Sequence, residues 1–183
     1  MKMIVVIIPA KGNSSRLPNK NMSLINGKPM IDYTVAEAKK SKLVSSIYVS
    51  TDTEFIAKHA QSLGIEIVMR PINLGGDVPV IEVYRHAVKT INNSSINTIV
   101  GMQPDHPDRN VKVDDALAFF EKANVDYLYS KEDEHTKNGS YMIMSRNYLE
   151  NKTGANETYL IDNCTNVHYK NDLKKAALNI KNK

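Results

Sequence analysis

The sequence predicts an α/β fold in which helices cover both faces of a mostly parallel sheet. Short apolar runs rich in β-branched residues alternate with segments whose apolar residues recur every three or four positions. This pattern is typical of strands and helices taking turns, and parallel strands need such helical crossovers. At 183 residues, with no repeat and no low-complexity linker, the chain is expected to form one domain over residues 1–183.

The individual elements follow from the spacing of apolar residues. The expected strands are residues 3–8, 46–50, 65–68, 97–102, 127–129, 141–144 and 166–168. The expected helices are residues 31–38, 56–63, 80–91, 113–120 and 173–180. Gly64 marks the end of the second helix. Because ligands of open α/β sheets bind beyond the carboxyl ends of strands, the loops after residues 8, 50 and 102 are expected to meet at one crevice.

The loop after the first strand has the composition of a phosphate-binding site. Residues 9–21 read PAKGNSSRLPNKN. Small residues at positions 12–15 let backbone N–H groups turn toward an anion, and Lys11, Arg16 and Lys20 add positive charge. Neither GxxxxGKS/T nor GxGxxG is present, which disfavours P-loop NTPases and dinucleotide dehydrogenases. A solvated basic loop is the alternative, and the preceding strand argues against it.

Residues 7–21, IIPAKGNSSRLPNKN, resemble the N-terminal signature of the sugar-activating cytidylyltransferases of the acylneuraminate (CMP-sialic acid synthetase) and octulosonate types. In that family the loop holds the triphosphate of CTP. The resemblance implies a three-layer, Rossmann-like fold of the nucleotide-diphospho-sugar transferase type. The nucleotide-binding residues that it implies are Pro9, Ala10, Lys11, Gly12, Asn13, Ser14, Ser15, Arg16, Lys20, Asn21, Asp52 and Arg70.

The loop after residue 102 resembles the patterns of both the acylneuraminate and the octulosonate enzymes. Residues 101–109 read GMQPDHPDR, whereas acylneuraminate enzymes carry QPTSPLR and octulosonate enzymes carry QGDEP. Asp105 stands where the octulosonate type places a magnesium-binding aspartate, so the resemblance implies Mg²⁺ held by Asp105. A turn aspartate that caps local N–H groups is the alternative. Two interpretations of His106 stay open: it contacts the substrate, or it is an exposed loop residue.

Three shorter segments extend the resemblance. Residues 50–52 resemble the family's STD, residues 138–139 its NG, and Arg70-Pro71 with Gly76-Asp77 its RPxxLAxD. Two interpretations of Arg70 stay open: it contacts a phosphate, or it forms an ion pair with Asp77.

The sequence departs from the family pattern at the expected metal ligands and at the site of the sugar acceptor. Where acylneuraminate enzymes carry DxDxxxDL, Asn166 and His168 replace two carboxylates, and neither is a good Mg²⁺ ligand. Asp172 persists, and two interpretations stay open for it: a magnesium carboxylate, or stabilisation of the N-terminus of the helix expected to start there. Residues 78–80 are Val-Pro-Val instead of the family's hydroxyl residues. The stretch before residue 138 is also shorter than in the family, whose insertion there lines the sugar site and reaches a partner subunit.

The resemblance implies an enzyme that activates an acidic sugar of the sialic or ulosonic acid type with CTP, giving a CMP-sugar and pyrophosphate. Lys20, Arg16 and Gln103 are its implied catalytic residues, which position the triphosphate and acceptor. Two alternatives remain open: a nucleotidyltransferase for another nucleotide or acceptor, and a non-catalytic nucleotide-binding module. The expected partners are CTP and a small acidic sugar, with a homodimer left open.

Composition favours a cytoplasmic protein that binds neither nucleic acid nor membrane. The formal net charge of +4 comes partly from lysines near the C-terminus, and aromatic residues that could stack on bases are few, with no Trp and three Phe. No apolar run is long enough for a bilayer. The lone Cys164 cannot form an internal disulfide, as expected in a reducing compartment.

Overall fold

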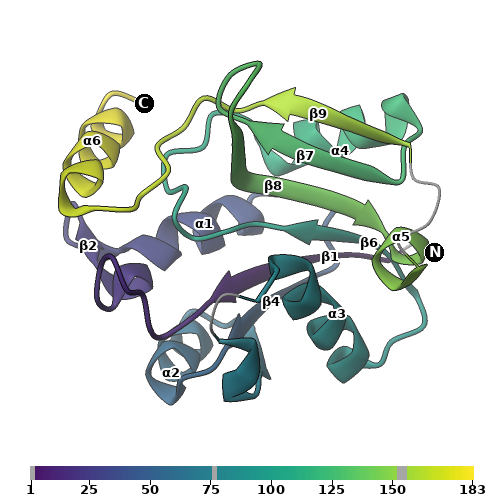
Figure 1. Cartoon of the computed structure of the whole chain (residues 1–183), viewed down its shortest axis with the longest axis horizontal. Coiled ribbons are helices and arrows are strands. Elements are labelled where there is room, and N and C mark those ends of the chain that lie inside the picture. Colours follow the sequence, from purple (N-terminus) through teal and green to yellow (C-terminus); the bar gives the residue numbers. More distant parts are fainter. Residues whose placement is uncertain (1–2, 76–77, 152–155) are drawn as a thin grey trace.

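One seven-stranded sheet forms the middle of the fold (Figure 1). The computed structural model describes residues 3–75, 78–151 and 156–183. The strands of the sheet are β1 (Met3–Ala10), β4 (Ser46–Thr51), β5 (Glu66–Met69), β6 (Ile96–Gly101), β7 (Tyr127–Lys131), β8 (Lys137–Ser145) and β9 (Glu157–Ile161). Their order is β5-β4-β1-β6-β8-β7-β9. Only β8 runs antiparallel to its neighbours, β6 and β7, so the predicted mostly parallel sheet is confirmed.

Helices cover both faces of this sheet, as the alternating pattern predicts. On one face lie α1 (Met30–Lys39), α2 (Glu54–Ser62) and α4 (Val113–Ala123), and on the other lie α3 (Val80–Ile91) and α5 (Arg146–Asn151). Strand β1 is buried on both sides: Val6 and Ile8 join the first core, Val5 and Ile7 the second, and all four are 0% exposed. An unbroken apolar run is what a strand covered on both faces requires.

A third, smaller core holds the last helix, α6 (Lys170–Lys181), against a two-stranded hairpin. The hairpin joins β2 (Leu24–Ile25) to β3 (Lys28–Pro29) through Asn26-Gly27, at φ 47° and 80°, and α6 lies beside it at the left of Figure 1. Positive φ at both central positions is the type I′ hairpin geometry that Asn-Gly favours. Ile25, Met30, Val167 and Ala176 form this core. Two short 3₁₀ helices, Lys20–Met22 and Ile72–Leu74, flank the sheet ends.

Several predicted boundaries are wrong. Residues 166–168 form no strand, because the Val167 N–H donates to the Asp105 carbonyl (2.9 Å) instead of a strand. The strand β9, the helix α5 and the hairpin were not predicted. Strand β1 continues through Ala10, so Pro9 lies within it, beyond the last β1–β6 pair at Ile7 and Gly101. The missing proline N–H therefore removes no bond to β6. Among the described residues, no helix is long and apolar enough to span a bilayer.

Candidate functional site

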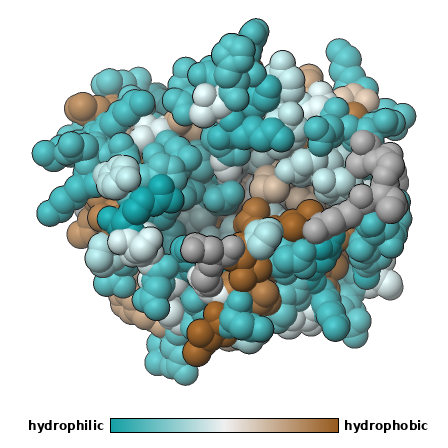
Figure 2. Space-filling model, viewed as in Figure 1, coloured by the Kyte–Doolittle hydropathy of each residue, from teal (hydrophilic) through white to brown (hydrophobic). Residues whose placement is uncertain are grey.

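The predicted loops after residues 8 and 102 meet at one cleft beside α3, at the carboxyl ends of β1, β5 and β6, whereas the loop after residue 50 borders an adjoining hollow. A cavity of about 170 Å³ is lined by Pro9, Lys11, Lys20, Asn21, Arg70, Leu74, Gly75, Val78, Val80, Val83, Gln103, Pro104 and Asp105. A shallower hollow of about 680 Å³ adjoins it and is lined by Lys11, Asn13, Ser14, Ser15, Pro18, Asn19, Asp52, Ile72 and Gly75. Figure 2 shows hydrophobic residues gathered in the lower middle of this face, where α3 lies in Figure 1, with a hydrophilic surface to their left. The cleft is thus polar on one wall and apolar on the other.

The loop after β1 is shaped by contacts to its own backbone. The Gly12 N–H donates to Asp52 Oδ1 (2.7 Å), and Asn21 Nδ2 donates to the Lys11 carbonyl (2.8 Å). A Cβ atom on Gly12 would lie 2.1 Å from Thr53 Cγ2, so this position has no room for a side chain. Asp52 and Asn21, both predicted nucleotide ligands, therefore also fix the course of the loop.

Lys20 and Asp105 form an ion pair at the base of the cleft. Lys20 Nζ lies 2.5 Å from Asp105 Oδ2, both side chains are 13% exposed, and Nζ also donates to the Val167 carbonyl (3.2 Å). Burial raises the pKa of Asp105, but His106 and Lys20 lower it by more, so that this pKa lies well below the usual range of an aspartate. The cleft therefore holds a permanent carboxylate beside an ammonium group.

His106 is not an exposed loop residue, because the structure buries it to 1% exposure. Its Nδ1 lies 3.0 Å from Asp105 Oδ1, and its Nε2 accepts the Gly139 N–H at 3.3 Å. Although these two atoms are close, neither His106 Nδ1 nor Asp105 Oδ1 makes a hydrogen bond of acceptable geometry to a described residue.

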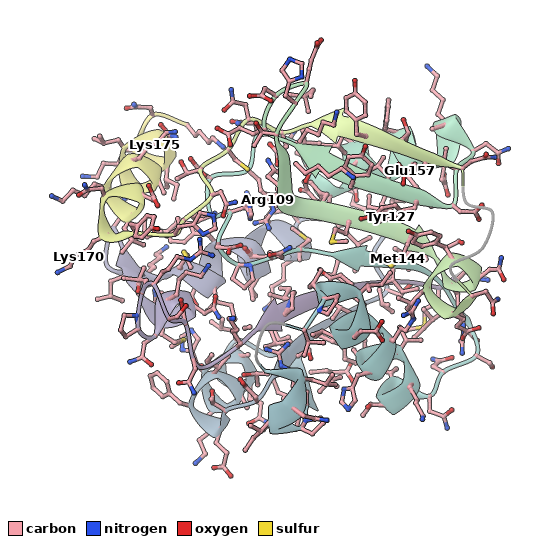
Figure 3. All side chains as sticks on the ribbon, viewed as in Figure 1. Arg109, Tyr127, Met144, Glu157, Lys170 and Lys175 are labelled. Atoms are coloured by element: carbon pink, nitrogen blue, oxygen red, sulfur yellow. The ribbon has the colours of Figure 1, made fainter. Side chains whose placement is uncertain are left out.

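Arg109 organises this loop, and the sequence analysis assigned it no role. Its guanidinium donates to the Gln103 carbonyl (2.5 Å), to the His106 carbonyl and to Thr34 Oγ1 (2.8 Å), and its Nε donates to the Ser140 carbonyl (3.1 Å). Figure 3 shows Arg109 near the centre of the molecule, beside β8. A buried arginine is stable there because four of its N–H donors meet fixed oxygen atoms. Its place at the end of the GMQPDHPDR segment was the available signal.

A bulge in β8 brings Gly139 to the cleft. The β7–β8 register shifts between Tyr129 and Lys131, and Gly139 lies in the extra length. The Gly139 carbonyl accepts the Gln103 N–H (3.2 Å), and a Cβ atom at Gly139 would lie 2.3 Å from Gln103 Nε2. Bulges of this kind often re-aim groups beside active sites. Gln103 is thus held at the edge of the cleft.

The late segment lies against the same loop. Asp172 Oδ2 accepts the N–H groups of His168 and Tyr169 (both 2.8 Å) at the start of α6, which confirms its role at the helix N-terminus. Burial lowers the pKa of His168, and the charges of Arg16 and Lys20 lower it further. His168 therefore lies within the field of the basic loop.

Other buried polar atoms around the cleft have no partner among the described residues. They include Arg70 Nε, Tyr84 Oη, Asp105 Oδ1, Asn166 Oδ1 and His168 Nδ1. Arg70 is 6% exposed, and burial lowers its pKa while Asp52 raises it. The Asp77 carboxylate that could pair with Arg70 lies outside the described residues. Unpartnered buried donors and acceptors at one cleft indicate a polar ligand.

The predicted site residues do not all line the cleft. Ala10 is 0% exposed and belongs to the core, and Arg16 is exposed and lines neither the cleft nor the adjoining hollow. The described residues contain no group of three or more His, Cys, Asp or Glu that could hold a metal ion alone. Among the described residues, Asp105 Oδ1 accepts no hydrogen bond of good geometry, although His106 Nδ1 lies 3.0 Å from it.

Comparison with known proteins gives consistent relatives. A 3-deoxy-manno-octulosonate cytidylyltransferase of Bdellovibrio bacteriovorus is 36% identical over 106 residues, covering 57% of this chain and 40% of the relative. An 8-amino-3,8-dideoxy-manno-octulosonate cytidylyltransferase of Shewanella amazonensis is 33% identical over 104 residues, covering 57% and 41%. The chain spans less than half the length of these relatives.

Solved structures share the fold at low identity. A CMP:2-keto-3-deoxy-manno-octonic acid synthetase complexed with CTP aligns with a TM-score of 0.78 at 14% identity, covering 98% of this chain and 99% of that one. A 4-diphosphocytidyl-2C-methyl-D-erythritol synthase of Anaerococcus prevotii aligns at 0.69 and 10% identity, covering 98% and 99%. The nucleotide-diphospho-sugar transferase type of fold is thereby confirmed. The family model described as cytidylyltransferase matches residues 5–177. The chain therefore belongs to the cytidylyltransferase family.

Proposed function

We propose that this chain transfers the CMP group of CTP to a hydroxyl of an acidic sugar of the ulosonic acid type and releases pyrophosphate. The observation that carries the proposal is the Lys20–Asp105 pair, 2.5 Å apart at the base of a cleft between the basic loop and Gln103. An ammonium group and an ionised carboxylate at this place suit a triphosphate and the cation that accompanies it. The octulosonate relatives, which are named as cytidylyltransferases, suggest the base and the sugar class.

The reaction requires positioning more than covalent chemistry. The sugar hydroxyl attacks the α-phosphorus, a new O–P bond forms, and the bond from the α-phosphorus to the bridging oxygen breaks. Pyrophosphate leaves with the electron pair, and the hydroxyl proton passes to water. Lys11, Arg16 and Lys20 would neutralise the triphosphate and the leaving pyrophosphate, and Gln103 would orient the reacting groups.

The residues around Asp105 fit a magnesium ion. Mg²⁺ in nucleotide sites usually takes one or two carboxylates and completes its shell with phosphate oxygens and water. Asp105 Oδ1 supplies one such oxygen and makes no hydrogen bond to the described residues, so the remaining ligands would come from phosphate and water. When bound, Mg²⁺ would neutralise charge on the phosphate oxygens. Asp105 would hold the ion, while Lys20 turns to the nucleotide.

The apolar wall suggests where selectivity lies. Val78 and Val80 line the cleft where the family has hydroxyl residues, so fewer hydrogen bonds reach the ligand from the start of α3 and the residues before it.

A homodimer and a cytoplasmic location stay predictions. Light scattering during gel filtration tests the first.

The decisive experiment measures pyrophosphate release with each of the four NTPs against a panel of acidic and neutral sugars. We expect release with CTP, Mg²⁺ and a 2-keto sugar acid only. Release with another NTP would redirect the proposal to another nucleotide. Absence of both turnover and nucleotide binding would refute it. Binding is measured by thermal shift, where nucleotide at a concentration ~100 times its dissociation constant should add about 2.7 kcal/mol of stability.

A further inference from the structure

His106 is a buried imidazole whose two nitrogen atoms have different neighbours. Gly139 donates its N–H to Nε2 at 3.3 Å, and Nδ1 lies 3.0 Å from Asp105 Oδ1. A ring nitrogen that accepts an N–H bond cannot carry a proton itself. In this arrangement Nδ1 is the ring nitrogen left to carry a proton, and it lies beside the Asp105 carboxylate.

The orientation of this ring is fixed from two sides. Arg109 donates to the His106 carbonyl, and the same guanidinium holds the Gln103 carbonyl. Gly139 bonds through its N–H to His106 and through its carbonyl to the Gln103 N–H. At 1% exposure, the ring also has no water to compete for its nitrogens. The 103–109 loop and the β8 bulge together hold Nδ1 toward Asp105.

Asp105 needs a second support if the cleft fills. Its Oδ2 is held by Lys20 at 2.5 Å, and its backbone carbonyl accepts the Val167 N–H. In the proposed function Lys20 turns to the phosphates, which removes the side-chain partner at Oδ2. Each carboxylate oxygen has two lone-pair sites, so Nδ1–H can occupy one site of Oδ1 and leave the other to a cation. Outer partners of this kind orient metal-binding carboxylates.

We infer that His106 is a positioning residue whose Nδ1–H holds the Asp105 carboxylate in place for a divalent cation once Lys20 has turned to the nucleotide. This inference rests on the proposed function for its ligand. It assigns no proton transfer to the ring. Lys20 and His106 thus support the same carboxylate in different states of the cleft.

Two isosteric substitutions separate the roles of the two nitrogens. In His106→Asn the amide nitrogen can stand at the place of Nδ1 and keep a donor toward Asp105. In His106→Gln the amide reaches the place of Nε2, which keeps the Gly139 contact and loses the donor. Mn²⁺ is titrated into the wild-type protein and both variants, with and without CTP, and water-proton relaxation reports the bound ion.

We expect Mn²⁺ affinity to fall about 10- to 100-fold in His106→Gln and to stay near wild type in His106→Asn. The Mg²⁺ concentration for half-maximal turnover should rise in the Gln variant, while the KM of the sugar stays unchanged. Equal affinities in all three proteins, equal losses in both variants, or a loss confined to the Asn variant would each overturn the inference. If the wild-type protein binds no CTP, the proposed function fails, and the titration without CTP still tests His106.

A measurement on the wild-type protein alone guards against variants that fail to fold. Nitrogen-15 NMR of the imidazole should show a protonated Nδ1 and an unprotonated Nε2 in the ligand-free state. A proton on Nε2 with none on Nδ1 would overturn the inference whatever the activity.

Discussion

Replacing Lys20 by methionine should weaken both the empty fold and nucleotide binding. The change removes the ammonium group and keeps most of the side-chain stem, so the cleft retains its packing. Lys20 and Asp105 are each 13% exposed, so the pair lies between solvent-exposed ion pairs and fully buried ones. Exposed ion pairs contribute about 0–1 kcal/mol, whereas breaking a fully buried pair costs about 3–5 kcal/mol. We therefore expect Lys20→Met to lower the free energy of unfolding by about 2–3 kcal/mol at neutral pH.

The same substitution removes a phosphate ligand. A hydrogen bond to a charged group contributes about 1.5–3 kcal/mol, so the Kd of CTP without Mg²⁺ should rise roughly 10- to 150-fold. Urea unfolding measures the first effect and calorimetry the second. The matched control is Lys28→Met, which removes an exposed lysine of β3 and should change neither. Unchanged CTP affinity in a destabilised Lys20→Met protein would show that Lys20 is structural, and the phosphate role would be refuted.

Four further predictions concern neighbouring residues. Asp105→Asn should reduce Mg²⁺-dependent turnover by orders of magnitude while Mg²⁺-free CTP binding is kept, and equal turnover would place the metal elsewhere. Because the folded pKa of Asp105 is depressed, its stabilisation is complete above the unfolded pKa of about 3.9 and lost as pH falls below it; unfolding curves of Asp105→Asn should lack that loss, and parallel curves would contradict it. Gly139→Ala should displace the end of the Gln103 side chain, raising the KM of a substrate while stability changes by less than about 1 kcal/mol; a large stability loss would show that the backbone moves instead. The double change Asn166→Asp with His168→Asp should raise turnover if a second cation limits the rate, and unchanged kinetics would assign the metal to Asp105 alone.

Local spacing was enough to predict most of the sheet. Strand β1 is an unbroken apolar run up to Pro9, β6 ends in a short apolar run, and α3 was predicted with its observed bounds, because burial on both faces or on one stripe leaves a clear pattern. Strand β9 was missed because its five residues, Glu157–Ile161, alternate too briefly to stand out. The hairpin was missed although Asn26-Gly27 is a strong turn signal.

For the site, the loop motifs identified which residues gather, and the cleft brings Lys11, Lys20, Arg70, Gln103 and Asp105 together. Their contacts could not be predicted, because they join residues far apart in the chain. No local pattern could pair Lys20 with Asp105. The burial of His106 likewise depends on a bulge in a strand that comes later in the sequence, so its residue type alone left two readings open.

The contacts of Lys20 also bear on the order in which the protein can mature. Its two hydrogen-bond partners lie 85 and 147 positions further along the chain, at Asp105 and Val167. During synthesis the basic loop emerges early, and its counter-charge and the carbonyl that anchors it are added only after most of the sheet exists. Contacts of such sequence separation form late, because the intervening chain must first be ordered. The cleft is therefore among the last parts of this fold to be assembled, although the basic loop precedes both of its partners in the chain.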